Sequence, residues 1–176
     1  QYAEKGWNVI ATSRSPSDDN DLINLAKANP NTQIEKMDVT NVNEILSLAD
    51  KYENQSIDLL INNAGMSGDR ANQAWGQIDK KEFEKLMSIN AFGALKVSEA
   101  FSRNISMSEE KKIVAISSVA GSISSMGRPS SLPILSISKA ALNMAMKTIA
   151  LRLKDDGVTV ILMNPGAVDT LSLIHI

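Results

Sequence analysis

The stretch "IDLLINNAG", residues 57–65, carries the pattern that decides the fold. It starts as a short run rich in Ile and Leu, and it ends in two asparagines, an alanine and Gly65. A short apolar run closed by a glycine turn is typical of a strand buried inside a parallel sheet. Glycine also lets the backbone at such a turn approach a ligand closely. We therefore predict a buried strand here, followed by a tight turn.

Four further segments repeat this strand pattern: "WNVIATS" (7–13), "TQIEKMDV" (32–39), "KKIVAISS" (111–118) and "VTVILMNPG" (158–166). Helical patterns separate them, at about residues 18–29, from Thr40 or Asn41 onward, and at about 79–104 and 134–156. Strands that alternate with helices imply right-handed crossovers. The sequence therefore predicts an α/β fold with a doubly wound parallel sheet of the Rossmann-like type.

Composition excludes several classes of protein. The 176 residues are 43% hydrophobic, which allows one domain with a sizeable core. The formal net charge of -2 gives no basic excess, so we expect neither nucleic acid nor an anionic membrane as a partner. No apolar run approaches the roughly 20 residues that span a bilayer. The absence of cysteine excludes thiolate metal sites, and we predict no metal and a cytoplasmic location.

Polar and charged residues stand where the predicted strands end. Arg14 and Asp38 close the first two strands, "NNAG" the third, Ser117 and Ser118 the fourth, and "NPG" the fifth. Because ligands of parallel sheets bind beyond the carboxyl ends of the strands, these groups should converge on one site. Structural alternatives remain: Arg14 as a solvated cation, Asp38 as a helix cap, and the serines and glycines as ordinary strand-end residues.

These motifs occur in the order found in short-chain dehydrogenases/reductases. The chain resembles that family through "NNAG" (62–65), "SIN" ending at Asn90, "ISS" ending at Ser118, the helix that carries Lys139, and "NPGAVDT" (164–170). The long segment between Ser118 and that helix is most similar to the C-factor and sniffer-like branch. The resemblance covers residues 1–170 and implies a dinucleotide-binding domain that lacks the family's first strand and glycine-rich loop.

The resemblance implies a nicotinamide cofactor and a set of residues that bind it. The turn "NNAG" would line the adenosine side, Asp38 would contact the adenine, and the "NPG" turn would cover the nicotinamide. A bare ribose usually meets an acidic residue near the end of the strand 7–13, whereas Ser13 and Arg14 stand here, which favours NADP(H) over NAD(H). The implied cofactor-binding residues are Arg14, Asp38, Asn62, Asn63, Ala64, Gly65, Lys139, Pro165, Gly166 and Thr170.

The resemblance also implies three catalytic residues and one departure from the family. Ser118 would bond the substrate oxygen, Lys139 the nicotinamide ribose, and Asn90 a water beside the lysine. Asn90 could instead serve only as a structural bridge, and Ser117 is the neighbouring candidate for the serine. Leu135 stands four residues before Lys139, where the family has the tyrosine that transfers a proton. Leucine can neither donate nor accept that proton.

Two hypotheses about function follow from this departure. The first is an NAD(P)(H)-dependent oxidoreductase that transfers hydride between the nicotinamide and a small carbonyl or alcohol, and that is either impaired or uses another proton donor. The second is a catalytically silent NADP(H)-binding sensor or scaffold protein. Family members often pair their long helices, so the resemblance allows a homo-oligomer, but the sequence does not determine the oligomeric state.

The two ends of the sequence break the regular pattern between them. The chain begins at Gln1 within an expected helix, and "LSLIHI" (171–176) does not continue the preceding strand and turn. These six residues match the translation of the end of a widely used transposon-based sequencing adapter. We therefore expect residues 1–170 to be a partial domain, truncated at both ends, and residues 171–176 to be a non-native tail. A natural apolar tail is the alternative. If the tail is non-native, His175, the only histidine, takes no part in catalysis.

Overall fold

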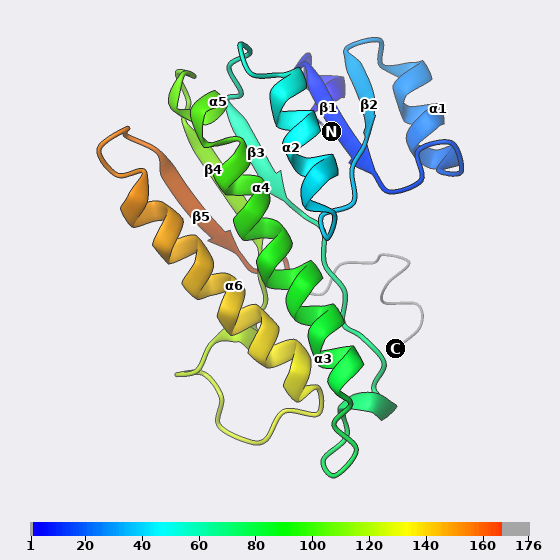
Figure 1. Ribbon diagram of the computed structural model, residues 1–176, viewed down its shortest axis with the longest axis vertical. Helices are drawn as coiled ribbons and strands as arrows, with labels where there is room; N and C mark the ends of the chain where they lie inside the picture. The colour runs from blue at the N-terminus through cyan, green and yellow to red at the C-terminus, as the bar shows by residue number, and fades with distance from the viewer. Residues whose placement is uncertain (1, 167–176) are drawn as a thin grey trace.

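The computed structural model describes residues 2–166 (Figure 1). Five strands alternate with helices in the predicted order: β1 (Val9–Ser13), β2 (Thr32–Lys36), β3 (Leu59–Asn62), β4 (Lys112–Ile116) and β5 (Thr159–Met163). Every strand pairing is parallel, β1 with β2, β3 with β4, and β4 with β5. The predicted α/β class with parallel strands is confirmed.

The strands form a two-stranded and a three-stranded sheet instead of one continuous sheet. A groove of about 900 Å³ separates β1 from β3, and residues of both strands line it. Among residues 2–166 no strand lies between them, in agreement with the prediction that the family's first strand is not part of this stretch. Ile61 of β3 lines this groove and is therefore 39% exposed, although its sequence pattern is that of a buried strand.

Three helices lie side by side over one face of the strands (Figure 1): α2 (Val42–Lys51), α4 (Ala94–Ala100) and α6 (Pro133–Arg152). The helix α1 (Asn20–Ala28) packs against β2. Asp19 and Asn41 cap α1 and α2, each accepting a bond from a backbone N–H of the first helical turn. Short 3-10 turns occur at Ala3–Lys5 (η1), Ala71–Gln73 (η2) and Val119–Gly121 (η4).

The long helix predicted over about 79–104 is present, but a π-helical turn and a break at Phe101 divide it. The segment consists of α3 (Lys80–Met87), the π-helical turn η3 (Ser88–Gly93), α4 and α5 (Ser102–Ser106). Two long-range contacts coincide with the π-helical turn: Asn90 bonds the backbone of Met66, and Gly93 lies so close to Val39 that a β-carbon would meet it at 2.9 Å. The helix predicted to reach residue 156 ends at Arg152, and residues 153–157 form turns in which Gly157 has φ +77°.

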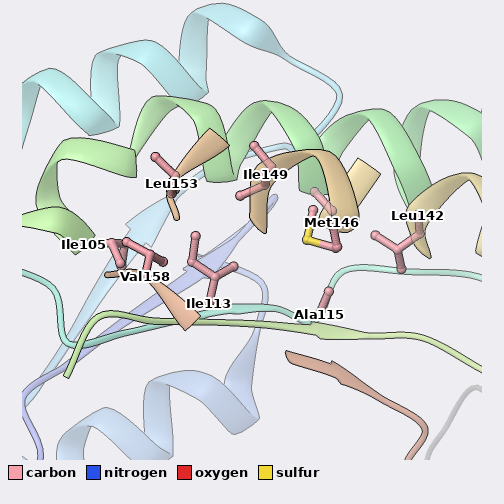
Figure 2. Close-up of a cluster of buried hydrophobic side chains, with 9 residues drawn as sticks. Ile105, Ile113, Ala115, Leu142, Met146, Ile149, Leu153 and Val158 are labelled. Atoms are coloured by element: carbon pink, nitrogen blue, oxygen red, sulfur yellow. The ribbon is translucent and has the colours of Figure 1, made fainter. Parts of the chain in front are cut away.

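The main apolar core fixes α6 against β4 (Figure 2). It joins residues of α4, α5, β4 and α6 with the start of β5: Ala94, Ile105, Ile113, Ala115, Leu142, Met146, Ile149, Leu153 and Val158. Burial of one such large side chain contributes about 1.5–3 kcal/mol. A second cluster packs α2 against α4: Met37, Ile45, Leu48, Ala49, Tyr52, Val97 and Phe101. Together the two clusters hold the helices that border the carboxyl ends of β3 and β4.

The helix α6 also satisfies a simple test for membrane spans. It has 20 residues and a mean hydropathy of 1.2, so length and composition alone would let it cross a bilayer. Core helices pass the same test, and Leu142, Met146 and Ile149 of α6 are buried in the main core. In the described part of the chain no other helix qualifies.

Candidate active site

Lys139 is buried where α6 crosses the carboxyl end of β4. Its residue is 8% exposed, and its Nζ donates a hydrogen bond of 2.8 Å to the carbonyl of Ile116, the last residue of β4. Removal of water around the ammonium lowers the pKa of Lys139 below its ordinary value of 10.5. Burying a cation is costly unless it is paired or hydrogen-bonded, and the carbonyl of Ile116 partners this one. Lys139 thus stands at the strand ends, where ligands of parallel sheets bind.

Gly65 and Asn90 meet Lys139 at the end of β3. A β-carbon on Gly65 would lie 3.3 Å from Nζ of Lys139 and 3.4 Å from Oδ1 of Asn90. Only a residue without a side chain fits comfortably in this space. Within the chain, Gly65 is approached closely by Lys139 and Asn90. The predicted close approach of its backbone to a ligand stays a prediction.

The side chain of Asn90 is fully buried and bridges two elements. Its Oδ1 accepts a bond from Met66 N at 2.8 Å, and its Nδ2 donates to Met66 O and to Ser138 Oγ, both at 2.9 Å. Asn90 thus ties the turn after β3 to α6, which is the structural alternative raised from the sequence. Its role in holding a water beside the lysine stays a prediction.

The two serines after β4 have different surroundings. Ser117 is buried and its Oγ donates to Oδ1 of Asn143 in α6 at 2.6 Å. Ser118 is partly exposed, and its Oγ accepts a bond of 3.1 Å from Ala120 N, which caps η4. Ser118 is therefore the more accessible of the two hydroxyls. Gly121, at the end of η4, packs directly on the backbone of Lys139, where a β-carbon would come within 2.7 Å.

Leu135 lies half-buried one helical turn before Lys139, so both project from the same side of α6. The two nearby serines of α6 are engaged elsewhere. Ser136 Oγ donates to Ser130 Oγ and Leu132 O, and Ser138 Oγ donates to Leu135 O while it accepts from Asn90. Neither hydroxyl takes the place of a proton-transfer group at position 135.

The asparagines of the turn Asn62–Gly65 divide into one structural and one exposed residue. Asn62 is buried, and its Nδ2 donates to Ser98 Oγ of α4 at 2.9 Å. Asn63 and Ala64 are exposed and line the groove between β1 and β3. In the turn, the accessible groups are therefore the Asn63 side chain and the backbone of residues 63–65.

Arg14 and Asp38 come together in a second, open hollow of about 860 Å³ at the ends of β1 and β2. Asp38 lies two residues beyond β2 rather than at its end, because β2 stops at Lys36. Its Oδ1 accepts bonds from Thr40 N and Oγ1, which are the main cause of its lowered pKa, with Arg14 and Lys36 adding their charges. The hollow also holds Lys36, paired with Glu44 at 3.1 Å, and several further carboxylates.

The last predicted cofactor-binding residues lie at the end of the described chain. Pro165 and Gly166 are exposed after β5, and Gly166 has φ +73°. Thr170 lies outside the described residues, as do the predicted tail 171–176 and His175. Within residues 2–166, no group of three or more His, Cys, Asp or Glu side chains is arranged to hold a metal ion.

Some site residues were missed from the sequence. Ser138 and the carbonyl of Ile116 complete the surroundings of Asn90 and Lys139, yet neither was named as a site residue, although Ile116 opens the motif "ISS". Ser138 stands on the buried side of α6 at the spacing of Leu142, which is a usable signal for burial. A backbone carbonyl such as that of Ile116 leaves no signal in the sequence.

The architecture by itself defines a class of protein, because a Rossmann-like parallel sheet with its polar residues at the strand ends is typical of dinucleotide binding. Comparison with known families gives the assignment within that class. The family model described as short chain dehydrogenase matches residues 1–174, and the chain belongs to this family. The match runs past residue 170, and the predicted domain boundary there stays a prediction.

Relatives and solved structures agree with this assignment. An uncharacterized oxidoreductase of Schizosaccharomyces pombe is 32% identical over 172 residues, which cover 95% of this chain and 65% of the relative. The C-signal protein of Myxococcus xanthus is 32% identical over 114 residues, covering 65% of this chain and 67% of that protein. The chain thus spans about two thirds of the length of these relatives.

Solved structures of the same family share the fold closely. A short-chain dehydrogenase/reductase from Burkholderia multivorans with bound NADP superimposes with a TM-score of 0.87 at 29% identity, covering 97% of this chain and 73% of that structure. A carbonyl reductase from Pseudomonas aeruginosa PAO1 in complex with NADP gives 0.84 at 26% identity, with the same coverage. These likenesses support a nicotinamide cofactor for the family to which the chain belongs.

Proposed function

We propose that the protein is an NADP(H)-dependent oxidoreductase that interconverts a small carbonyl and its alcohol, with a turnover limited by Leu135. The observation that carries this proposal is the buried Lys139 beside Gly65 and Asn90, one helical turn from a hydrocarbon side chain. The site has the supporting groups of its family, while the group that would transfer the proton is replaced.

The residues present fit a nicotinamide dinucleotide. Lys139 supplies a buried cation, and the small residues Ala64 and Gly65 leave the backbone open at the end of β3. At the other end of the site, the hollow beside β1 holds Arg14, Lys36 and the hydroxyls of Ser13 and Ser15, a donor set suited to a phosphate. This set favours NADP(H) over NAD(H), although the carboxylates of the same hollow reduce the preference.

Each residue would then have a limited task. When bound, the nicotinamide supplies the carbon that gives or takes the hydride. Lys139 would bond the ribose and keep a positive charge near the reacting oxygen, and Ser118 would donate a hydrogen bond to that oxygen. Leu135 would pack against the substrate without moving a proton. Loss of a positioned acid or base typically lowers a rate by a factor of about 10² to 10⁴.

The second candidate function is a catalytically silent sensor or scaffold that binds NADP(H). It is favoured by the hydrogen bonds of Ser136 and Ser138, which engage the only hydroxyls of α6 near Leu135 in other contacts. Both candidates bind the cofactor through the same groups, so they differ only in turnover. We expect a cytoplasmic protein in either case, with a small molecule as the partner of the first candidate and homo-oligomer formation as an open prediction.

Consumption of NADPH separates the two candidates. The full-length product of the gene is incubated with NADPH and a panel of aldehydes and ketones, and the nicotinamide absorbance is followed. Slow but protein-dependent oxidation of NADPH with at least one carbonyl supports the oxidoreductase. Saturable NADPH binding without turnover over the whole panel supports the silent binding protein and contradicts the first proposal.

A further inference from the structure

Gln73 is a fully buried side chain that joins two segments far apart in the sequence. Its Oε1 accepts a bond of 2.9 Å from the backbone N–H of Leu135, 62 positions away. Its Nε2 donates to the carbonyls of Ser67 at 2.8 Å and Asp69 at 3.2 Å. Both ends of the carboxamide are therefore used, and the side chain connects the loop after β3 with the first turn of α6.

The start of α6 has no cap of its own. The N-cap residue Leu132 makes no side-chain cap, and Pro133 has no N–H. Leu135 is the third helical residue, and its N–H is the group that an N-cap side chain normally bonds. Gln73 fills this role from the loop. In contrast, α1, α2 and α3 are capped locally, by Asp19, Asn41 and Asp79.

The loop that carries Gln73 is itself fixed from a second side. Glu82 of α3 is 7% exposed, and its Oε1 accepts a bond of 2.7 Å from Asp69 N. Gly68 has φ +75°, and a β-carbon there would lie 2.5 Å from that same oxygen and 3.0 Å from Nε2 of Gln73. Since Met66 is bonded by Asn90, the chain from Gly65 to Asp69 is tied to α3, η3 and, through Gln73, α6.

We propose that Gln73 is a positioning residue that holds the first turn of α6, with residues 135 and 139, in fixed relation to the turn Asn62–Gly65. These two elements carry the groups assigned above to the nicotinamide half of the site. The inference thus deepens the proposed function, but the contacts that support it lie within the chain. It can be tested without any cofactor.

The test compares Gln73→Met with Asn104→Leu in the full-length gene product. Both replacements keep the approximate size of the side chain and remove a buried amide. Asn104 is 2% exposed and donates to Tyr52 O at 2.7 Å and Gln55 O at 2.8 Å, before β3 begins and away from the site. It is therefore a matched control for the general cost of losing a buried bridge.

Two NMR measurements report on the site: hydrogen exchange of the Leu135 amide and the pKa of Lys139. We expect Gln73→Met to speed exchange of that amide roughly 3- to 10-fold relative to wild type, as expected for one lost hydrogen bond. The pKa of Lys139 should move up toward 10.5 as water reaches the loosened turn. Asn104→Leu should change neither quantity. Unchanged values in Gln73→Met, or equal changes in Asn104→Leu, would overturn the proposal.

A second variant separates capping from positioning. Leu132→Ser in the Gln73→Met background gives α6 a local cap without adding a charge near Lys139, but does not reconnect the helix to the loop. Protection of the Leu135 amide should return, while the pKa of Lys139 should stay raised. If both return to wild-type values, Gln73 is a helix cap and nothing more, and the positioning role is refuted. Should Gln73→Met alone not fold, the locally capped double variant still gives the deciding pKa.

Cofactor affinity is measured in the same samples as an independent readout. If wild type binds NADPH, Gln73→Met and the double variant should both bind it more weakly than Asn104→Leu does. A wild-type protein that binds neither NADPH nor NADH would refute the proposed function, while the exchange rate and the pKa would still decide the role of Gln73. Unchanged exchange and pKa with normal NADPH binding would refute the role of Gln73 alone.

Discussion

The two halves of α6 bury different chemistry at similar depth. The first half, taken as residues 133–141, buries the polar Ser136, Ser138 and Lys139 besides the apolar Ile134, and the second half, residues 142–152, buries only apolar side chains, Leu142, Met146 and Ile149. Buried polar groups cost stability unless they are bonded, and those three each have a hydrogen-bond partner. The second half therefore supplies packing energy, whereas the first half supplies a defined arrangement of polar groups. This division indicates that the first half is maintained for the site, and each half can be tested separately.

The largest expected effect comes from the first half, from Leu135→Tyr. It places a phenol one turn before the buried ammonium of Lys139, which favours the ionised form and makes proton transfer at the site feasible. We expect turnover of NADPH with a responsive carbonyl to rise by about 10² to 10⁴. Leu135→Phe is the matched control, because it adds the ring without the hydroxyl. Equal rates for the two variants would contradict the site assignment.

The next largest effect belongs to the second half, through Met146→Ala. Met146 is 1% exposed in the main core, so its truncation should lower the free energy of unfolding by about 2–5 kcal/mol. Affinity for NADPH should stay within about twofold of wild type under folding conditions, because Met146 contributes only packing. Chemical denaturation and an NADPH titration measure the two quantities. A large loss of affinity would remove the distinction between the halves.

A smaller effect is expected for Ser138→Ala in the first half. The change removes the hydroxyl that accepts from Asn90 and donates to Leu135 O. Stability should fall by about 0.5–1.5 kcal/mol, less than for Met146→Ala. NADPH affinity should nevertheless fall several-fold, since the link between η3 and α6 is lost. If Ser138→Ala leaves affinity unchanged while Met146→Ala lowers it, the proposed roles of the two halves are reversed.

The smallest effect is a pH dependence caused by Lys139. Burial lowers its folded-state pKa below 10.5, so in the interval between the two values the unfolded chain binds more protons. Below the folded-state pKa, Lys139 is charged in both states, and the full cost of burying that charge lowers the stability of the fold. The free energy of unfolding should therefore rise with pH through that interval. Lys139→Met should lack this rise.

Tyr52 acts in the opposite direction at higher pH, in a range that begins near the upper end of the Lys139 interval. Burial, with the nearby Glu35, raises its pKa to about 12, so its contribution to stability falls as pH increases above about 10. Tyr52 is present in both proteins, so its contribution cancels when the free energy of unfolding of Lys139→Met is subtracted from that of wild type. If this difference in the free energy of unfolding does not increase as the pH rises toward 10.5, the burial assigned to Lys139 is contradicted.

Local patterns predicted much of this molecule, and long-range contacts account for the rest. All five strands and their parallel order followed from short apolar runs such as 57–61, because burial on both faces leaves a strong pattern. The interruption of the helix at Ser88–Gly93 was missed, since the contacts to Met66 and Val39 come from distant residues.

The candidate site was likewise predicted only where local motifs mark its residues. Lys139, Gly65 and Asn90 were named from motifs, and the structure brings them together. Gln73 stands in a polar loop, where no periodic pattern marks a buried residue, and only the packing of α3 and α6 around that loop makes it a bridge. The roles of all these residues toward a cofactor stay predictions.

The central claim is that the groups around Lys139 still bind a dinucleotide although position 135 cannot transfer a proton. An equilibrium titration of NADPH into the full-length gene product, in parallel with Lys139→Met, tests it most directly. The account predicts saturable binding by wild type, clearly weakened by Lys139→Met. Absence of binding for both NADPH and NADH to a folded wild-type protein would contradict it.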